Sequence, residues 1–417
     1  MNVKHKLREY YPAFTHRNFK LFWTGQVISL IGSWMQNAAL NWLVYSITND
    51  RFLLGLMSAV QFTPLFLFSL YAGLVIEKYP KRKIIIATQT FQLIAAFLLF
   101  FMVFFNKTNY FLILLILFCI GTVQTFDNPA RQAFVVEMVE GRAHLLNAIA
   151  LNSAAFNGAR LIGPAVAGRI MADLGVRWCF FLNAVSFIAV IIGLFMMKME
   201  DKASKKDIIN PRKEIIEGLK YIRKTPRLLY TIISTAIIPT FCINFNILVP
   251  PYTKDVLHLS EKAFGMLLSS LGLGALISAL TVAAKGKKER AFLYQLIGSF
   301  GLSASLIITG LITNYHYALL SLAVCGFFMI MFTTTSNSVL QYYSPDEMRG
   351  RIMSVYSLVF GGLVPVGSLY AGTVSKFLGT NNAFIISGII GFMGFLLLFS
   401  RRRELNDGKL RRNTQSS

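Results

Sequence analysis

The chain has 417 residues, of which 55% are hydrophobic and only 14% are charged. Soluble globular domains are typically about 45–50% apolar and about 25% charged, so this composition excludes an ordinary soluble enzyme. The net charge of +22 does not indicate nucleic-acid binding, because the basic residues gather in alternate loops between long apolar segments. The four cysteines form no CxxC pair and the five histidines have no metal-ligand spacing, so we expect no disulfide framework, metal site or cofactor.

The apolar segments predict an all-α membrane protein with twelve membrane-spanning helices, because about 20 mostly apolar residues cross the hydrocarbon core. The predicted spans of the first half are 18–46, 53–76, 84–105, 110–136, 145–172 and 178–197. Those of the second half are 229–253, 263–284, 291–312, 316–342, 352–375 and 382–400. The sequence therefore predicts two six-helix bundles, residues 1–197 and 229–417, joined by a linker at 198–228.

The distribution of the 41 Lys and Arg residues predicts the orientation of these spans. Thirty-two of them fall at the two ends, in the linker and in one set of loops, six fall in the opposite loops, and three lie inside spans. Cytoplasmic loops of membrane proteins carry the excess of Lys and Arg. Both ends of the chain and the linker are therefore predicted to be cytoplasmic. The basic and polar first 20 residues do not have the pattern of a cleavable signal peptide.

The linker contains a predicted amphipathic helix. Asn210 and Pro211 are typical of a helix start, as the capping residue and the first helical residue. Four apolar residues fall on one face of this helix, ringed by basic residues: Ile215, Ile216, Leu219 and Ile222. This pattern favours a helix lying on an anionic membrane surface, and a solvated linker helix is the alternative.

Glycines recur at matching positions in the two halves, which indicates an internal repeat. Gly163, Gly168 and Gly175 correspond to Gly367, Gly372 and Gly379, each 204 positions later, and Gly55 corresponds to Gly265, 210 later. Transporters are commonly built from such repeats, with the substrate bound between the two halves near the middle of the membrane.

The loop between the second and third predicted spans carries an acid among basic residues. It runs from Gly73 through Glu77 to Lys83 and includes Lys78, Lys81 and Arg82. This run resembles the G-x-x-x-D-[RK]-x-G-[RK]-[RK] signature of the major facilitator superfamily, with Glu77 and Pro80 as departures. The resemblance implies a close helix approach at the glycine and an acid that pairs across a cytoplasmic gate. An ordinary positive-inside loop is the alternative, but topology does not require the carboxylate.

The fifth predicted span is rich in small residues around a proline: Gly158, Gly163, Pro164 and Gly168. This pattern resembles the glycine–proline motif on the fifth helix of exporters of the superfamily, and the resemblance implies export rather than uptake. Close packing of helices through small residues explains the pattern equally well without any link to the direction of transport.

The fourth predicted span ends in a D-x-P-A-R-Q run from Asp127 to Gln132. This run and the residues after it resemble the branch of the superfamily that includes the enterobactin exporter and macrolide efflux proteins, and the resemblance extends over essentially the whole chain. It implies a monomeric transporter of the bacterial inner membrane. It does not identify the substrate.

Five charged residues lie in or beside the predicted spans of the first half: Glu77, Asp127, Arg131, Glu137 and Arg160. A charge at the centre of a membrane helix costs roughly 2.5–3.5 kcal/mol on insertion scales, so such residues usually have a function. Asp127 and Arg131 are four residues apart and can pair on one helix face. We expect all five to form a network near the cytoplasmic side, in which Asp127 or Glu77, and after them Glu137, carries a proton. A purely structural network is the alternative.

Uncharged polar residues in other spans predict a cavity for a bulky amphipathic substrate, although each of them can instead form hydrogen bonds between helices. They are Gln36, Asn37, Asn41, Gln61, Gln124, Asn152, Asn157, Asn244, Asn246, Thr334 and Asn337.

The sequence thus predicts a proton-coupled exporter of a small amphipathic compound, such as a siderophore, a macrolide-like drug or a metabolite. Uptake, or movement of a lysophospholipid, is an alternative within transport. A non-transporting membrane sensor is the alternative of another class, but it would need a larger soluble domain or tail than this chain carries. Its expected partners are the substrate, the proton and the lipid bilayer.

Overall fold

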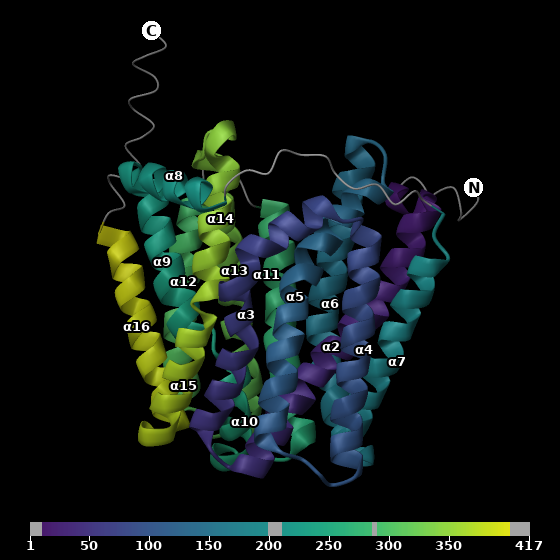
Figure 1. The fold of residues 1–417 in the computed structure, drawn as a ribbon. Coiled ribbons are helices and arrows are strands. Elements are labelled where there is room, and N and C mark those ends of the chain that lie inside the picture. Colours follow the sequence, from purple (N-terminus) through teal and green to yellow (C-terminus); the bar gives the residue numbers. More distant parts are fainter. Residues whose placement is uncertain (1–10, 199–210, 286–289, 401–417) are drawn as a thin grey trace, which may run out of the picture. The chain divides into compact units, whose positions relative to one another are not determined.

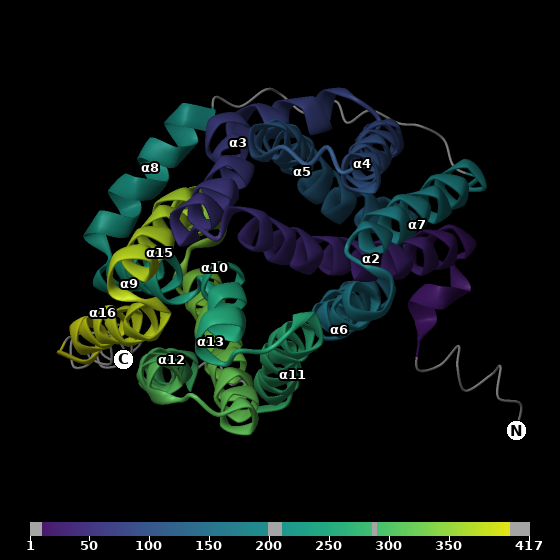
Figure 2. The same cartoon turned by 90° about the horizontal axis from the view of Figure 1, so that it is seen from below.

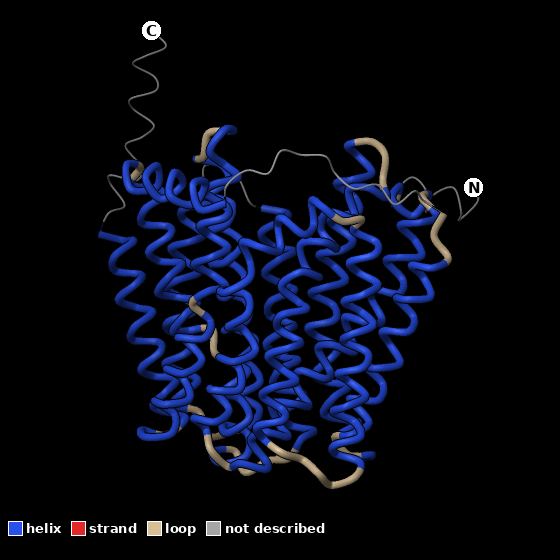
Figure 3. The backbone as a smooth tube through the Cα atoms, in the orientation of Figure 1, coloured by secondary structure: helices blue, strands red, loops and turns tan. Residues whose placement is uncertain are grey.

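The computed structural model describes residues 11–198, 211–285 and 290–400, and all regular secondary structure within these ranges is helical (Figures 1 and 3). The helices of the first half are η1 (Pro12–Thr15), α2 (Arg17–Thr48), α3 (Arg51–Lys78), α4 (Lys81–Phe104), α5 (Tyr110–Met138), α6 (Arg142–Leu174) and α7 (Arg177–Phe195). They are followed by α8 (Pro211–Lys224), α9 (Pro226–Cys242), α10 (Phe245–Pro251), η2 (Tyr252–Val256), α11 (Glu261–Lys285), α12 (Ala291–Leu311), α13 (Tyr315–Tyr343), α14 (Asp346–Gly362), α15 (Val364–Leu378) and α16 (Thr380–Ser400).

Ten helical segments in the described ranges are long and apolar enough to cross a membrane. Two of the ten combine shorter helices, because the backbone breaks after Cys242 and near Leu363 within otherwise continuous spans. The helices α2 and α6 are also long enough, with 32 and 33 residues, but their amide, charged and small residues keep them below the hydropathy of the other ten. The predicted total of twelve spans therefore depends on α2 and α6.

The chain forms two compact units. The first contains residues 1–49, 60–208 and 260–269, and the second contains residues 50–59, 209–259 and 270–417. These units differ from the two predicted bundles at two short segments. The start of α3 packs with the second unit, and the start of α11 packs with the first.

Small residues allow the helices of each unit to approach closely. A Cβ atom added to Gly121 of α5 would lie 1.9 Å from the backbone oxygen of Gln61 in α3. In the second unit, a Cβ atom on Gly326 of α13 would lie 1.9 Å from the oxygen of Leu271 in α11. Backbone contacts of this kind are typical of membrane helices, where packing rather than water exclusion holds the helices together.

The internal repeat is visible in the backbone. Gly175 follows α6 with φ +95°, and Gly379 follows α15 with φ +87°. Both are left-handed backbone conformations that residues other than glycine rarely adopt. The two glycines thus end repeat-related helices in the same way.

The linker helix α8 begins at Pro211, as its sequence predicts, while the expected cap Asn210 lies outside the described residues. Its apolar residues are divided between two environments. Ile222 is buried against α9 and α14, whereas Ile216 and Leu219 are exposed. An ion pair of 2.6 Å between Glu217 and Arg351 of α14 attaches the helix to the second unit. The exposed pair leaves an apolar strip suited to a membrane surface.

Candidate transport site

The best-defined charged group in the first unit is the carboxylate of Asp127 on α5, which is only 5% exposed. Nε of Arg131 donates to its Oδ2 at 2.6 Å, so the ion pair expected from the four-residue spacing is present. Two side chains of α4 complete its surroundings. The hydroxyl of Thr88 and the amide of Gln89 both donate to the carboxylate. Asp127 is therefore held by one cation and two neutral donors inside the bundle.

The loop motif forms a second, separate charged group. Nζ of Lys81 lies 2.6 Å from the carboxylate of Glu137, which joins the start of α4 to the end of α5. Nε of Arg82 donates to the backbone oxygen of Leu194 at 2.9 Å and so satisfies a carbonyl at the end of α7. Lys78 lies over the ring of the neighbouring Tyr79.

Two residues of the loop motif do not make the contacts that the resemblance implies. A Cβ atom added to Gly73 would meet nothing within 4 Å, so this glycine does not mark a close helix approach in this structure. Glu77 forms no ion pair with any residue that the structure describes. The five-residue network expected from the sequence is thus reduced to the Asp127–Arg131 and Lys81–Glu137 pairs.

Arg160 also lies outside that network. Its guanidinium stacks on the rings of Trp34 and Phe156, 5.1 and 5.2 Å from their centroids. Its Nη1 is shielded from solvent and has no hydrogen-bond partner in the described structure. The sequence predicted Arg160 as a member of that network, and the structure supplies aromatic rings in place of a carboxylate partner.

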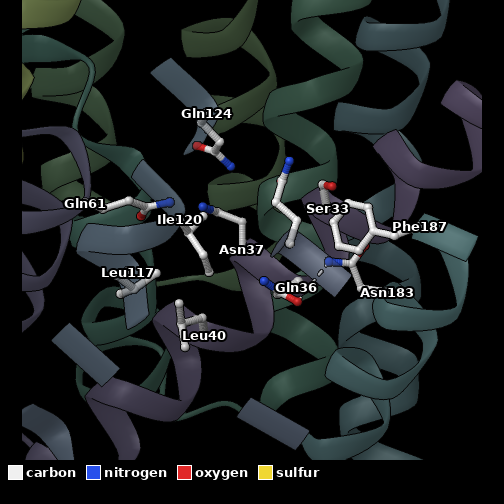
Figure 4. Close-up of a pocket in the computed structure, with 11 residues that line it drawn as sticks. Ser33, Gln36, Asn37, Leu40, Gln61, Leu117, Ile120, Gln124, Asn183 and Phe187 are labelled. Atoms are coloured by element: carbon white, nitrogen blue, oxygen red, sulfur yellow. Dashed lines mark hydrogen bonds between the residues drawn. The ribbon is translucent and has the colours of Figure 1, made fainter. Parts of the chain in front are cut away.

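A small polar cavity lies inside the first unit, with a volume of about 40 Å³ (Figure 4). Four of the predicted cavity residues line it: Gln36, Asn37, Gln61 and Gln124. The rest of its lining is Ser33, Leu40, Gln92, Leu117, Ile120, Asn183 and Phe187, which the sequence analysis did not select. Figure 4 shows the amide groups converging from α2, α3, α5 and α7, with one hydrogen bond of 2.8 Å from Asn183 to Gln36.

The volume of this cavity decides what it can hold. Ligand pockets for drug-sized molecules measure about 300–1,000 Å³. A cavity of about 40 Å³ accommodates only a few water molecules, each of which needs about 10–15 Å³ by the same measure. Its amide lining supplies the polar partners that buried waters require. We therefore interpret it as a hydrated cavity rather than as the place of a bulky substrate.

The other predicted cavity residues are placed differently. Asn41 is buried and donates to Asn37, and Asn157 donates to the backbone one turn earlier in α6. The amide oxygen of Asn152 is shielded and has no partner in the described part of the chain. In the second unit, Asn244, between α9 and α10, donates to the backbone oxygen of Thr240 in α9. Asn337 accepts from Gln341, Asn246 is half-buried and Thr334 is exposed.

The glycine–proline motif of α6 makes two close contacts. A Cβ atom on Gly163 would lie 2.5 Å from the Cβ of Trp34 in α2. A Cβ atom on Gly168 would lie 2.9 Å from the Cα of Gly265 at the start of α11. A Cβ atom on Gly265 would in turn lie 2.4 Å from the backbone oxygen of Pro164. Gly158 differs, because a Cβ atom there would meet nothing within 4 Å.

The repeat-related contact occurs in the second unit, between two glycines of the internal repeat and beside ion pairs that sequence reasoning missed. A Cβ atom on Gly55 of α3 would lie 3.1 Å from the Cα of Gly372 in α15. Ion pairs flank this crossing: Asp50 with Lys376 at 2.6 Å, and Arg51 with Asp255 at 2.7 Å. Their partners are more than 200 positions away in the sequence, so no local spacing pointed to them.

The carboxyl of Asp50 allows a prediction of how its contribution to the stability of the protein depends on pH. Burial raises the pKa of its carboxyl, but hydrogen bonds from Lys376 and from the amide of Phe52 outweigh burial and hold the pKa below its ordinary value of 3.8. Its contribution to stability is therefore complete above that value and is lost only as the pH falls through the lowered pKa. Asp50→Asn should lower the melting temperature of the purified protein by the same small amount at pH 5, 6.5 and 8. A difference that disappears within this range would contradict the assignment.

The helical segments long and apolar enough to cross a membrane and the two compact units are typical of a multi-pass membrane transporter. The family model described as "Transmembrane secretion effector" matches residues 9–414. The chain therefore belongs to this family of the major facilitator superfamily and is not an enzyme.

Known proteins with similar sequences are transporters of the same superfamily. The chain is 24% identical over 396 residues to the staphyloferrin A transporter of Staphylococcus aureus, which covers 93% of this chain and 96% of the relative. It is 19% identical over 383 residues to macrolide efflux protein A of Streptococcus pyogenes, with 90% and 94% covered. These relatives confirm the branch that the D-x-P-A-R-Q run indicated.

A solved structure supports the fold independently. A POT family transporter in complex with a thioalcohol-conjugated peptide superimposes with a TM-score of 0.75 at 12% identity, over 93% of this chain and 96% of that one. At this identity the likeness shows the major facilitator fold alone.

Proposed function

We propose that the protein is a proton-coupled exporter of a small amphipathic compound, with both ends of the chain in the cytoplasm. The observation that carries this proposal is the buried carboxylate of Asp127, held by Arg131, Thr88 and Gln89 inside a membrane bundle. Intramembrane carboxylates of transporters commonly belong to proton pathways.

The hydrated cavity gives this carboxylate a route for protons. Gln124 lines the cavity and lies three residues before Asp127 on α5, which is about 4.5 Å along the helix. Gln92 also lines the cavity and lies three residues after Gln89, which donates to Asp127. Waters that occupy the cavity would therefore lie about one helical turn from the carboxylate along two adjacent helices.

Export as the direction is supported by the α6 motif and by the relatives, one of which is a macrolide efflux protein. Siderophores and drugs are the substrate classes that the names of the relatives suggest. The second candidate, uptake by the same fold, is not favoured by any contact among the residues that the structure describes.

Efflux from energised cells tests the proposal. Cells that express the chain are loaded with fluorescent amphiphiles, macrolides or catecholate siderophores, and release is followed with and without a protonophore. We expect release that stops when the proton gradient collapses. Accumulation in place of release would overturn the direction, and release that is insensitive to the protonophore would overturn the coupling.

A further inference from the structure

The helices α2 and α6 carry polar atoms that the protein itself leaves unsatisfied. Nine shielded side-chain nitrogen or oxygen atoms lack a hydrogen-bond partner in the described residues, and four of them come from these two helices. They are Nε1 of Trp23, Oε1 of Gln26, Oδ1 of Asn152 and Nη1 of Arg160. An unpaired buried polar group costs about 1–3 kcal/mol, and more when it is charged, so such a concentration calls for a partner.

The packing of α2 and α6 places the four residues at neighbouring levels of the two helices. Both helices start at the same end, because His16 and His144 are in hydrogen-bond contact at 2.8 Å. Further along, Gly163 packs against Trp34. Both contacts join residues 128 or 129 positions apart, so Trp23 is level with Asn152, and Gln26 lies between that level and the level of Arg160. The four groups therefore extend over about eight residues, or roughly 12 Å of helix.

Arg160 is the charged residue among these four. Trp34 and Phe156 hold its guanidinium by stacking, which leaves the planar edge with its N–H groups free for an acceptor. Three carboxylates of the first unit are already engaged with other cations: Asp127 with Arg131, Glu137 with Lys81, and Asp173 with Arg169. The residue as a whole keeps partial exposure, so a ligand can reach it.

The depth of Arg160 argues against a lipid headgroup as the acceptor. It is the nineteenth residue of the 33-residue α6, within about 5 Å of the middle of that helix. If the helix is centred in a hydrocarbon core about 30 Å thick, lipid phosphates lie about a full helical turn or more beyond reach on either side.

We propose that Arg160 binds an anionic oxygen group, a carboxylate or phosphate, of the transported compound. Trp23, Gln26 and Asn152, at neighbouring levels of α2 and α6, are the candidates to bind its other polar groups. The substrate class is thus an acidic amphiphile with several hydrogen-bonding groups. This inference rests on the proposed transport function and adds the chemical nature of the substrate.

Binding to the purified full-length protein in phosphatidylcholine nanodiscs tests the site. The probes are 4-phenylbutyrate and its uncharged analogue 4-phenylbutyramide, which differ in the anionic group. Because Trp34 stacks on Arg160, its fluorescence reports binding, and Trp34→Phe identifies that signal. We expect saturable binding of the carboxylate, and binding of the amide weaker by about tenfold or more, as for the loss of a charged hydrogen bond.

Variants of two arginines on the same helix locate the effect. Arg160→Gln should weaken binding of the carboxylate by roughly tenfold or more. Arg169→Gln is the matched control, because Arg169 is exposed and paired with Asp173, and it should bind like the wild type. Arg160→Lys keeps the charge without the planar fork and should fall between them, which provides a second readout if Arg160→Gln folds poorly.

Three results would overturn the proposal: equal affinity of wild type and Arg160→Gln, equal affinity for the two probes, or an Arg160-dependent signal from phosphatidylglycerol in the nanodisc without any probe. The last of these would assign the arginine to lipid. Binding is separate from the efflux assay. A chain that binds the carboxylate through Arg160 but releases nothing from cells would contradict the proposed export while supporting this site.

Discussion

Asp127→Asn is expected to abolish protonophore-sensitive export and to destabilise the protein. The substitution keeps the shape and the hydrogen bonds with Thr88 and Gln89 but removes the titratable group and the charge that faces Arg131. Removing one partner of a buried ion pair costs roughly 3–5 kcal/mol, because the other charge is left uncompensated. The loss should appear as a clearly lower melting temperature of the purified protein, alongside the loss of efflux.

A double variant separates coupling from stability. Asp127→Asn combined with Arg131→Gln removes both charges, so its stability should recover relative to either single variant, with an interaction energy of about 0.5–3 kcal/mol in a double-mutant cycle. Export should not recover, because no carboxylate remains. If the double variant regains protonophore-sensitive export, Asp127 is a structural residue and the proton is carried elsewhere.

Glu137 provides the matched control for these variants. It also belongs to an ion pair in the first unit, with Lys81, but its side chain is 36% exposed and it lies at the end of α5. Surface pairs contribute about 0–1 kcal/mol. Glu137→Gln should therefore lower the melting temperature only slightly and leave the protonophore sensitivity of export intact.

Local spacing in the sequence was enough to predict the helical membrane architecture and one ion pair. Long apolar segments set the helices, and the four-residue spacing set the Asp127–Arg131 pair, because both depend on residues close together in the chain. The other donors to Asp127, Thr88 and Gln89, come from a different helix, and spacing on α5 carries no information about its neighbour. The polar residues of α4 in the predicted span 84–105 were the only available signal.

The glycine motifs show a different limit of sequence reasoning. Gly73 and Gly163 both belong to recognisable motifs, but only Gly163 faces another helix closely in this structure. A small residue permits close approach without determining whether a helix lies opposite. For the same reason, the packing of 50–59 with the second unit and of 260–269 with the first could not be predicted from the composition of either segment.

Leucine substitutions at the two glycine contacts, α6 with α11 and α3 with α15, are expected to have the second large effect on export. Gly265→Leu and Gly372→Leu should each stop export while the protein still folds and reaches the membrane. At both positions an added Cβ atom meets the backbone of another helix, which cannot move aside as a side chain can: Gly168 and Pro164 at Gly265, and Arg51 and Gly55 at Gly372. Overpacking of this kind costs typically about 1–3 kcal/mol, which is enough to separate the helices locally.

The repeat explains why both substitutions should act alike. Gly55 and Gly265 are equivalent positions of the two halves, as are Gly168 and Gly372, so the α3–α15 and α6–α11 crossings are the same contact made twice. Alternating access requires such contacts to form and release during each cycle. A leucine at either position should keep the two helices of that contact apart and so stop the transport cycle. The expected effect is the same for the substitution in either half.

Cysteine labelling distinguishes this blocked state from simple misfolding. Ser58 is buried at the α3–α15 crossing, where Ser368 donates a hydrogen bond to it at 3.1 Å. A Ser58→Cys variant should react slowly with a membrane-impermeant maleimide, and adding Gly372→Leu should make the reaction several times faster. Gly350→Leu is the control, since a Cβ atom there meets nothing within 4 Å. Unchanged labelling together with lost export would show that the crossing is not the contact that opens, and unchanged export in both leucine variants would remove it from the transport cycle altogether.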